Sequence, residues 1–256
     1  MAPVSTRAIV LRSHDYGDSS RILRLYTHDF GLLSVMARGV RGRSGKGTTT
    51  VASFATGDLI AYVRPHRDLH TMKEFECTAL RSHLGSHVLR FAGASAFAEL
   101  VLAHAEEEPQ TGLFDALERV LDALDGAEVP ALAGTVLAGL WVITEAFGFA
   151  PQLDPCVRCD TNIEKDEVGR FDFPAGGVRC SRCGEDAAGP RVGPIARGQL
   201  GRLLTGDVPE GLTHARQHLD LVSDFIAYHV VARPLKSLRF LGGVLPAEVE
   251  AEESDG

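Results

Sequence analysis

The sequence predicts an α+β multidomain protein in which a small closed five-stranded β-barrel is followed by an α-helical domain that carries a four-cysteine zinc finger. Three observations lead to this fold class. The first eighty residues contain short stretches with strand-like alternation, apolar residues recur at helical spacing from about residue 80, and two Cys-x-x-Cys pairs stand in the C-terminal half. A chain of 256 residues is long enough for one large domain or two to three small ones.

Five segments of the N-terminal part are apolar and β-branched and are separated by turn residues. They cover residues 7–11, 20–26, 32–37, 58–63 and 69–76. A long loop separates the third segment from the fourth. Five short strands of this kind favour a closed barrel, because closure leaves no exposed sheet edge. A fifth cysteine of the chain, Cys77, lies next to the last segment and is predicted to be a small buried apolar residue.

Helical periodicity begins after the predicted barrel. Apolar residues recur at spacings of three and four in 89–103, 113–124 and 219–230, and an uncharged helix is predicted from residue 131. Small residues of that helix, Ala131, Gly134 and Ala138, predict the close approach of a neighbouring helix. The uncharged stretch 129–144 is too short to span a bilayer and is predicted to be a core helix. The acidic segment from residue 246 is predicted to be disordered.

The two cysteine pairs have the spacing of a zinc site. Cys156 and Cys159 form the first pair, and Cys180 and Cys183 form the second. Two such turns can surround Zn²⁺ tetrahedrally, and four thiolates leave no open position, so the predicted metal is structural, with one ion per chain. The alternative is two buried cysteine pairs or disulfides. The N-terminus has no apolar signal region, which predicts a cytoplasmic protein and favours metal ligands over disulfides.

Charge is distributed unevenly along the chain. Residues 1–80 hold eleven Lys and Arg against seven Asp and Glu, whereas the remainder holds fifteen against twenty-seven, so that +4 and −12 give the net charge of −8. A basic N-terminal module on an acidic body indicates a polyanionic partner. Ordinary scatter of surface charge is the alternative explanation of the +4.

The predicted loop between the third and fourth strands collects cationic side chains. Four of them are separated by glycines, and they are Arg38, Arg41, Arg43 and Lys46. Three more extend the predicted surface from the last hairpin, and they are Arg64, Arg67 and Lys73. Arginine binds phosphate bidentately and without reading base sequence, so these seven residues are the predicted DNA-binding residues. A solvated basic loop without a ligand is the alternative.

Nucleic-acid-binding barrels usually add aromatic rings on which bases stack. The rings available in the predicted barrel are Tyr26, Phe54 and Tyr62. Tyr62 alternates with apolar neighbours and fits the core equally well.

Several stretches, taken together, resemble the bacterial recombination-mediator family RecO. They are YGDSSRI at 16–22, THDFG at 27–31, ARGVR at 37–41, FAELV at 97–101 with EEEP at 106–109, FGFAPQLDPC at 147–156, and RPLKSLRFL at 233–241. The resemblance extends from Thr6 to Leu241, with the pieces in the family's order. The loop at 45–51 departs from the family pattern because it is short of apolar residues, which puts the limits of the DNA surface in doubt.

The resemblance implies an OB-fold barrel, a helical domain with an inserted zinc finger, and no catalytic turnover. It implies binding of single- and double-stranded DNA, annealing of complementary strands, and work with RecR and the single-strand-binding protein to load RecA, in the cytoplasm and at the nucleoid. The expected domains are the OB-fold at 1–79, helical parts at 80–153 and 190–245, the zinc finger at 154–189, and the acidic tail at 246–256.

A basic cluster near the C-terminus is the predicted partner-binding site. It consists of Arg233, Lys236 and Arg239 beside the apolar Leu235, Leu238, Phe240 and Leu241. A basic rim around an apolar groove suits an acidic tail that ends in apolar residues. The family resemblance implies that the tail of the single-strand-binding protein is such a ligand. The alternative is a C-terminal segment that packs into the core with its charges solvated.

Two other function classes remain as alternatives. One is an enzyme such as a zinc hydrolase or nucleotidase, and the other is a zinc-knuckle interaction or transcription factor without annealing activity. Histidine pairs at 83/87 and 214/218 have helical spacing but lack the Glu of a metalloprotease motif, so they are predicted to be exposed or half-buried.

Overall fold

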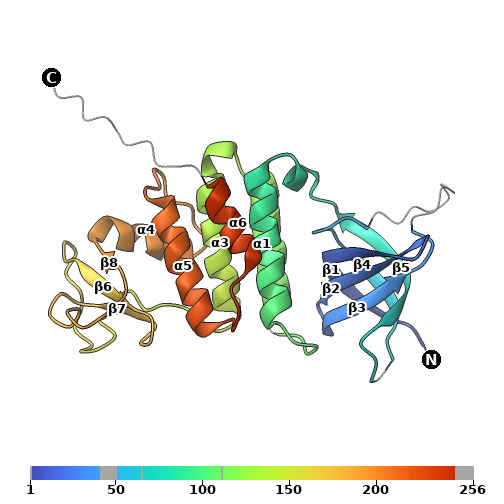
Figure 1. Ribbon diagram of the computed structural model, residues 1–256, viewed down its shortest axis with the longest axis horizontal. Helices are drawn as coiled ribbons and strands as arrows, with labels where there is room; N and C mark the ends of the chain where they lie inside the picture. Colours follow the sequence, from blue (N-terminus) through green and yellow to red (C-terminus); the bar gives the residue numbers. More distant parts are fainter. Residues whose placement is uncertain (1, 41–50, 65, 111, 246–256) are drawn as a thin grey trace. The chain divides into compact units, whose positions relative to one another are not determined.

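The computed structural model describes residues 2–40, 51–64, 66–110 and 112–245 (Figure 1). The chain divides into two compact units, Met1–Gly126 and Ala127–Gly256. The first contains a barrel and two α-helices, and the second contains four α-helices and a small sheet within the described residues. The finer domain boundaries at 79, 153, 189 and 245 stay a prediction, and the predicted tail lies outside the described residues.

Five strands close into a barrel, as the sequence predicts. They are β1 (Val4–Tyr16), β2 (Ser20–Thr27), β3 (Gly31–Ala37), β4 (Thr56–Tyr62) and β5 (His70–Ala79). Their order is β1-β2-β3-β5-β4, and β1 pairs with β4 to complete the ring, which is the OB-fold architecture. Ten buried residues fill its interior: Ala8, Val10, Leu23, Leu25, Val35, Ala37, Val51, Leu59, Ala61 and Phe75.

Two helices follow the barrel in the first unit. After a short 3₁₀ turn (Ser82–Gly85), α1 covers Val88–His104 and α2 covers Leu113–Gly126. Arg81 joins the barrel to α2, because its buried guanidinium donates to the Phe54 carbonyl at 2.7 Å, to the Thr56 hydroxyl at 2.8 Å and to Asp122 at 2.7 Å.

One end of the barrel is covered by these helices and the segment between them. Gly31 has φ +62°, and an added Cβ there would lie 2.5 Å from the Glu106 carbonyl oxygen. The Tyr26 hydroxyl accepts a hydrogen bond of 3.1 Å from the Gln110 backbone. The guanidinium of Arg7 donates to both carboxylate oxygens of Glu118 at 2.6 Å. The start of β1 and the end of β2 therefore face α2, and the other end of the β1–β2 hairpin is exposed.

The second unit is built around α3 (Leu132–Ala146), against which α4 (Pro194–Leu204) and α5 (Ala215–His229) pack, and it ends with α6 (Lys236–Val244). The buried Trp141 of α3 contacts Phe225 of α5 with ring centroids 5.2 Å apart. The stretch Val129–Ala146 is long and apolar enough to cross a membrane, but 67% of it is buried, as a core helix requires. Three short strands, β6 (Gly169–Asp172), β7 (Gly177–Arg179) and β8 (Arg191–Val192), form a sheet of order β7-β6-β8 (Figure 1).

The glycine of the small-residue strip of α3 permits a close contact. An added Cβ at Gly134 would lie 2.5 Å from Val208 Cγ1. Val208 belongs to the non-helical segment between α4 and α5. At Gly134 the close neighbour is therefore this segment and not a helix, although α4 and α5 also pack against α3.

Candidate metal centre and nucleic-acid interface

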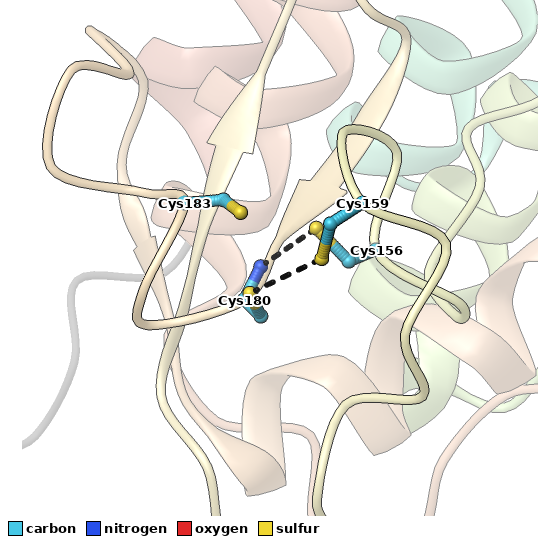
Figure 2. Close-up of side chains that lie close together, drawn as sticks. All are labelled: Cys156, Cys159, Cys180 and Cys183. Atoms are coloured by element: carbon cyan, nitrogen blue, oxygen red, sulfur yellow. Dashed lines mark hydrogen bonds between the residues drawn. The ribbon is translucent and has the colours of Figure 1, made fainter.

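The four predicted metal ligands lie together in the second unit. The sulfur atoms of Cys156, Cys159, Cys180 and Cys183 all lie within 4.8 Å of one another (Figure 2). Cys159 Sγ and Cys180 Sγ are 3.8 Å apart. Ligands about 2.3 Å from a tetrahedral zinc ion would be separated by about 3.8 Å, so this group of cysteines fits a metal ion of that kind.

Two backbone turns present these sulfurs. In the first, Asp160 has φ +58° and donates its N–H to the Cys156 carbonyl at 2.9 Å. In the second, which follows β7, the Cys183 N–H donates to the Cys180 carbonyl at 3.1 Å. The turns are joined by the Cys180 N–H, which donates to Cys156 Sγ at 3.3 Å (Figure 2). Backbone hydrogen bonds within each turn thus shape both turns.

Three thiols of the cluster differ in their readiness to ionise. Hydrogen bonding with Thr161 lowers the pKa of Cys159 to about 6. Hydrogen bonding with Cys159 raises the pKa of Cys183 to about 12. Burial opposes ionisation of Cys156, but backbone N–H groups of Cys180, Arg158 and Cys159 lower its pKa on balance. A thiolate beside N–H donors is the form of cysteine that binds a metal cation.

A polar network ties the second cysteine turn to α4. Glu167 accepts a hydrogen bond of 2.6 Å from the Ser181 N–H, and hydrogen bonding with the side chain and backbone of Ser181 lowers the pKa of Glu167. Arg197 of α4 donates to the carbonyls of Glu167 at 2.9 Å and Glu164 at 2.6 Å. The metal site is therefore anchored to the helical part of its own unit.

The predicted DNA-binding residues fall in three places. Arg38 is exposed directly after β3, whereas Arg41, Arg43 and Lys46 lie outside the described residues. Arg64 and Arg67 are exposed in the turn between β4 and β5. Lys73 is exposed on β5.

The register of β3 and β5 brings two of these cations to one end of the barrel. Met36 and Thr71 are partners in the parallel pairing of the two strands. Arg38 and Lys73 each lie two residues beyond that pair, toward the same end. Arg64 and Arg67 precede the paired part of β5 and form a separate group.

The rings expected to stack on bases are mostly buried, so this prediction is wrong for two of them. Tyr26 is 1% exposed and Phe54 is 5% exposed, because the helices of the first unit cover them, whereas Tyr62 is half-buried. Tyr16, at the end of β1, is 54% exposed and was not among the expected rings. Its position in the YGDSSRI stretch, beside a predicted turn, was the sequence signal for it.

The predicted partner-binding cations are exposed at the C-terminal end of the described chain. Arg233 precedes α6, and Lys236 and Arg239 lie on it. The apolar residues of the predicted groove are mostly packed inside, since Leu235, Leu238 and Leu241 are buried and Phe240 alone of the four is exposed. This packing agrees with the alternative of a core-packed segment with solvated charges.

One histidine differs from the expectation of exposed or half-buried side chains. His218 is 5% exposed, its Nε2 lies 3.1 Å from Gln199 Oε1, and burial lowers its pKa. His83 is exposed, and the half-buried His87 side chain accepts a hydrogen bond from the Leu89 N–H at the start of α1. These contacts give His218 and His87 structural roles.

Comparison with known proteins covers both units. Residues 1–81 match the family model for the N-terminal domain of recombination protein O, and residues 86–239 match the model for its C-terminal domain. The chain is 36% identical to the DNA repair protein RecO of Rubrobacter xylanophilus over 79% of this chain and 80% of the relative. It is 32% identical to that of Desulfatibacillum aliphaticivorans over 94% and 97% of the two chains, and 30% identical to that of a Nocardioides species over 91% and 97%.

These matches agree with the closed barrel and the four-cysteine group, and they confirm the resemblance found in the sequence. The chain belongs to the RecO family of DNA repair and recombination proteins.

Proposed function

We propose that this chain is a non-catalytic recombination mediator that binds single- and double-stranded DNA and promotes the annealing of complementary strands. In this role it acts with RecR to load RecA onto DNA coated by the single-strand-binding protein, in the cytoplasm and in association with the nucleoid. The observation that carries the proposal is the match to both RecO models, over the barrel and over the helical part.

The proposed DNA-binding residues are those of the barrel and its long loop. They are Arg38, Arg41, Arg43, Lys46, Arg64, Arg67 and Lys73. The exposure of Arg38, Arg64, Arg67 and Lys73 supports the proposal, because phosphate contacts require side chains that reach solvent. Such binding ignores base sequence and falls steeply with salt.

The four cysteines are proposed to hold one structural zinc ion. Their mutual distances and their all-sulfur chemistry support zinc, and four protein ligands leave no position for a substrate. The cations Arg233, Lys236 and Arg239 are proposed to meet the acidic tail of the single-strand-binding protein. The exposed Phe240, which follows Arg239 in α6, supports an apolar contact next to these cations.

A strand-annealing assay with and without the single-strand-binding protein tests the proposal. Wild-type protein should accelerate annealing, and replacing Arg38, Arg41 and Arg43 together by Ala should reduce both annealing and affinity for random DNA. Each cation that no longer binds a phosphate should flatten the slope of log affinity against log salt by about 0.7 to 0.9. Absence of annealing in folded, zinc-loaded protein would instead favour a zinc-knuckle interaction or transcription factor.

A further inference from the structure

The exposed end of the β1–β2 hairpin has an outer face of unusual composition. In this antiparallel pair Arg12 lies opposite Arg24, His14 opposite Ile22, and Tyr16 opposite Ser20. Side chains alternate between the two faces of a strand, and the residues between these pairs, such as Leu23, fill the barrel core. Arg12, His14, Tyr16, Ile22 and Arg24 therefore share the outer face.

Two cations on this face lie directly across from each other. Side chains opposite each other in an antiparallel pair have Cβ atoms about 5 Å apart, and like charges in such positions repel. No carboxylate in the described parts of the chain pairs with Arg12 or Arg24, and the buried Nε of Arg24 has no hydrogen-bond partner there. Arg21 and Asp15 form an ion pair of 3.0 Å in this hairpin. These two residues alternate with Arg12 and Arg24 along the strands and so belong to the other face.

A backbone phosphate would offset part of this repulsion. A guanidinium offers parallel donors to a phosphate, and one phosphate between Arg12 and Arg24 would attract both cations. The neighbouring end of β3 leads to Arg38, which is also exposed. The cations of this face are therefore followed by Arg38 at the end of the neighbouring strand β3.

An aromatic ring stands on the same face. Tyr16 is 54% exposed and makes no ring contact with another described aromatic side chain. It follows Arg12 by four residues, a distance of about 14 Å along a strand. A ring exposed in this way offers a surface for a base, but the bases of a duplex are already stacked on one another and cannot lie on it.

We infer that the outer face of the β1–β2 hairpin binds single-stranded DNA, with a backbone phosphate between Arg12 and Arg24 and an unstacked base on Tyr16. This inference rests on the proposed DNA-binding function and deepens it, because it assigns single strands to a particular face. Arg12 and Arg24 supply affinity for the phosphate chain, and Tyr16 supplies the preference for unpaired bases.

Three ligands of equal length separate these two roles: a random single strand, the matching duplex, and a chain of abasic nucleotides. Tyr16→Leu should weaken binding of the single strand by about 5- to 150-fold, the range for loss of one stacked base. It should leave the affinities for the duplex and for the abasic chain unchanged. Arg24→Gln should weaken binding of both the single strand and the abasic chain, and should flatten the salt slope on each by about 0.7.

Matched controls are available on the same molecule. Tyr228 of α5 is 57% exposed, so Tyr228→Leu removes an equally exposed ring, and Arg119→Gln removes a cation of α2 that lies away from this face. Both controls should bind like wild type, and thermal melting should show that all variants are folded. Wild-type protein that binds none of the three ligands would refute the proposed function itself. Wild-type protein that binds single strands, with Tyr16→Leu binding them equally well or weakened equally on the abasic chain, would overturn only this inference.

Discussion

The barrel buries ten core residues, nine of them within five strands of seven to thirteen residues, whereas the four-cysteine module has three strands of only two to four residues. A closed sheet pairs its own edges and fills its own interior, so the barrel carries its stabilising contacts within itself. Strands as short as those of the module are not stable by themselves. The module relies on the cysteine cluster and on contacts such as that of Phe171 with Phe225 of α5. Burial of apolar surface holds one region, and the proposed zinc ion would hold the other by cross-linking its two cysteine turns.

The largest difference in stability between the two regions should follow loss of the proposed zinc ion. Structural zinc contributes on the order of 10 kcal/mol to the folding of small modules. Cys180→Ala should abolish zinc binding and unfold the module, while strand signals of the barrel persist. The chain has one tryptophan, Trp141, and it packs on Phe225 close to the module, so its fluorescence should change in the variant.

Cys77→Ala is the matched control for that experiment, because Cys77 packs against the barrel core and is not part of the cluster. Elemental analysis should find one zinc per chain in the control. A wild-type protein that carries far less than one zinc per chain, and that melts identically with and without a chelator, would contradict the comparison.

A cavity in the barrel should destabilise the first unit and leave the four-cysteine module unchanged. Leu25 is fully buried, and Leu25→Ala should lower the free energy of unfolding of the first unit by about 2–5 kcal/mol, the usual cost of such a cavity. Zinc content and Trp141 fluorescence should stay at wild-type values at temperatures where the second unit is folded. Denaturant unfolding followed by circular dichroism and by fluorescence measures the two effects separately. Loss of zinc in this variant would show that the regions are not independent.

Arg81 tests how far the barrel depends on its helices. Arg81→Leu removes the donors to the Phe54 carbonyl and the Thr56 hydroxyl, and should destabilise the first unit by about 1–3 kcal/mol because these acceptors lose their partner. Arg119 of α2 is exposed and serves as the control. Arg119→Leu should lower the free energy of unfolding much less. Equal melting temperatures for the two variants would show that the hydrogen bonds of Arg81 do not stabilise the barrel.

The smallest effects concern two glycines within helices of the second unit. Gly134→Ala should destabilise that unit by about 1–3 kcal/mol, because the new methyl group would overlap Val208. Gly198→Ala in α4 meets no atom within 4 Å and should stabilise the unit by up to about 1 kcal/mol through better helix propensity. Thermal melting of both variants should give shifts of opposite sign, and shifts of the same sign would show that packing does not control Gly134.

Sequence patterns correctly predicted the structural features that depend on residues close together in the chain. The cysteine pairs sit in turns made by their own backbones, and the barrel strands follow from alternation. The strand β1 runs to Tyr16, beyond the predicted end at residue 11, because pairing with β2 continues after the apolar run stops. The helix α4 was not predicted, since only Leu200 and Leu203 of it are buried and two glycines interrupt it.

The features that the sequence patterns missed depend on contacts between residues far apart in the sequence. Tyr26 is buried beside Gln110, which lies 84 residues further along the chain, so its alternation in β2 could not distinguish a covered ring from an exposed one. His218 is buried and hydrogen-bonded to Gln199 of α4, a helix that the sequence did not indicate. The exposure of Tyr16 likewise follows from which end of the barrel the helices cover.

Gly31 and Tyr26 contact residues 106–110, and these contacts determine which fragment of the chain is suitable for studying the barrel by itself. A fragment that ends at residue 79 would lack Arg81 and its hydrogen bonds to the β3–β4 connection and β4, and it would uncover the Tyr26 ring. An exposed apolar patch of that kind promotes self-association, which would imitate cooperative binding in a DNA titration. A fragment that ends at Gly126 keeps the compact unit whole and is the proper minimal piece for measuring the barrel's own affinity.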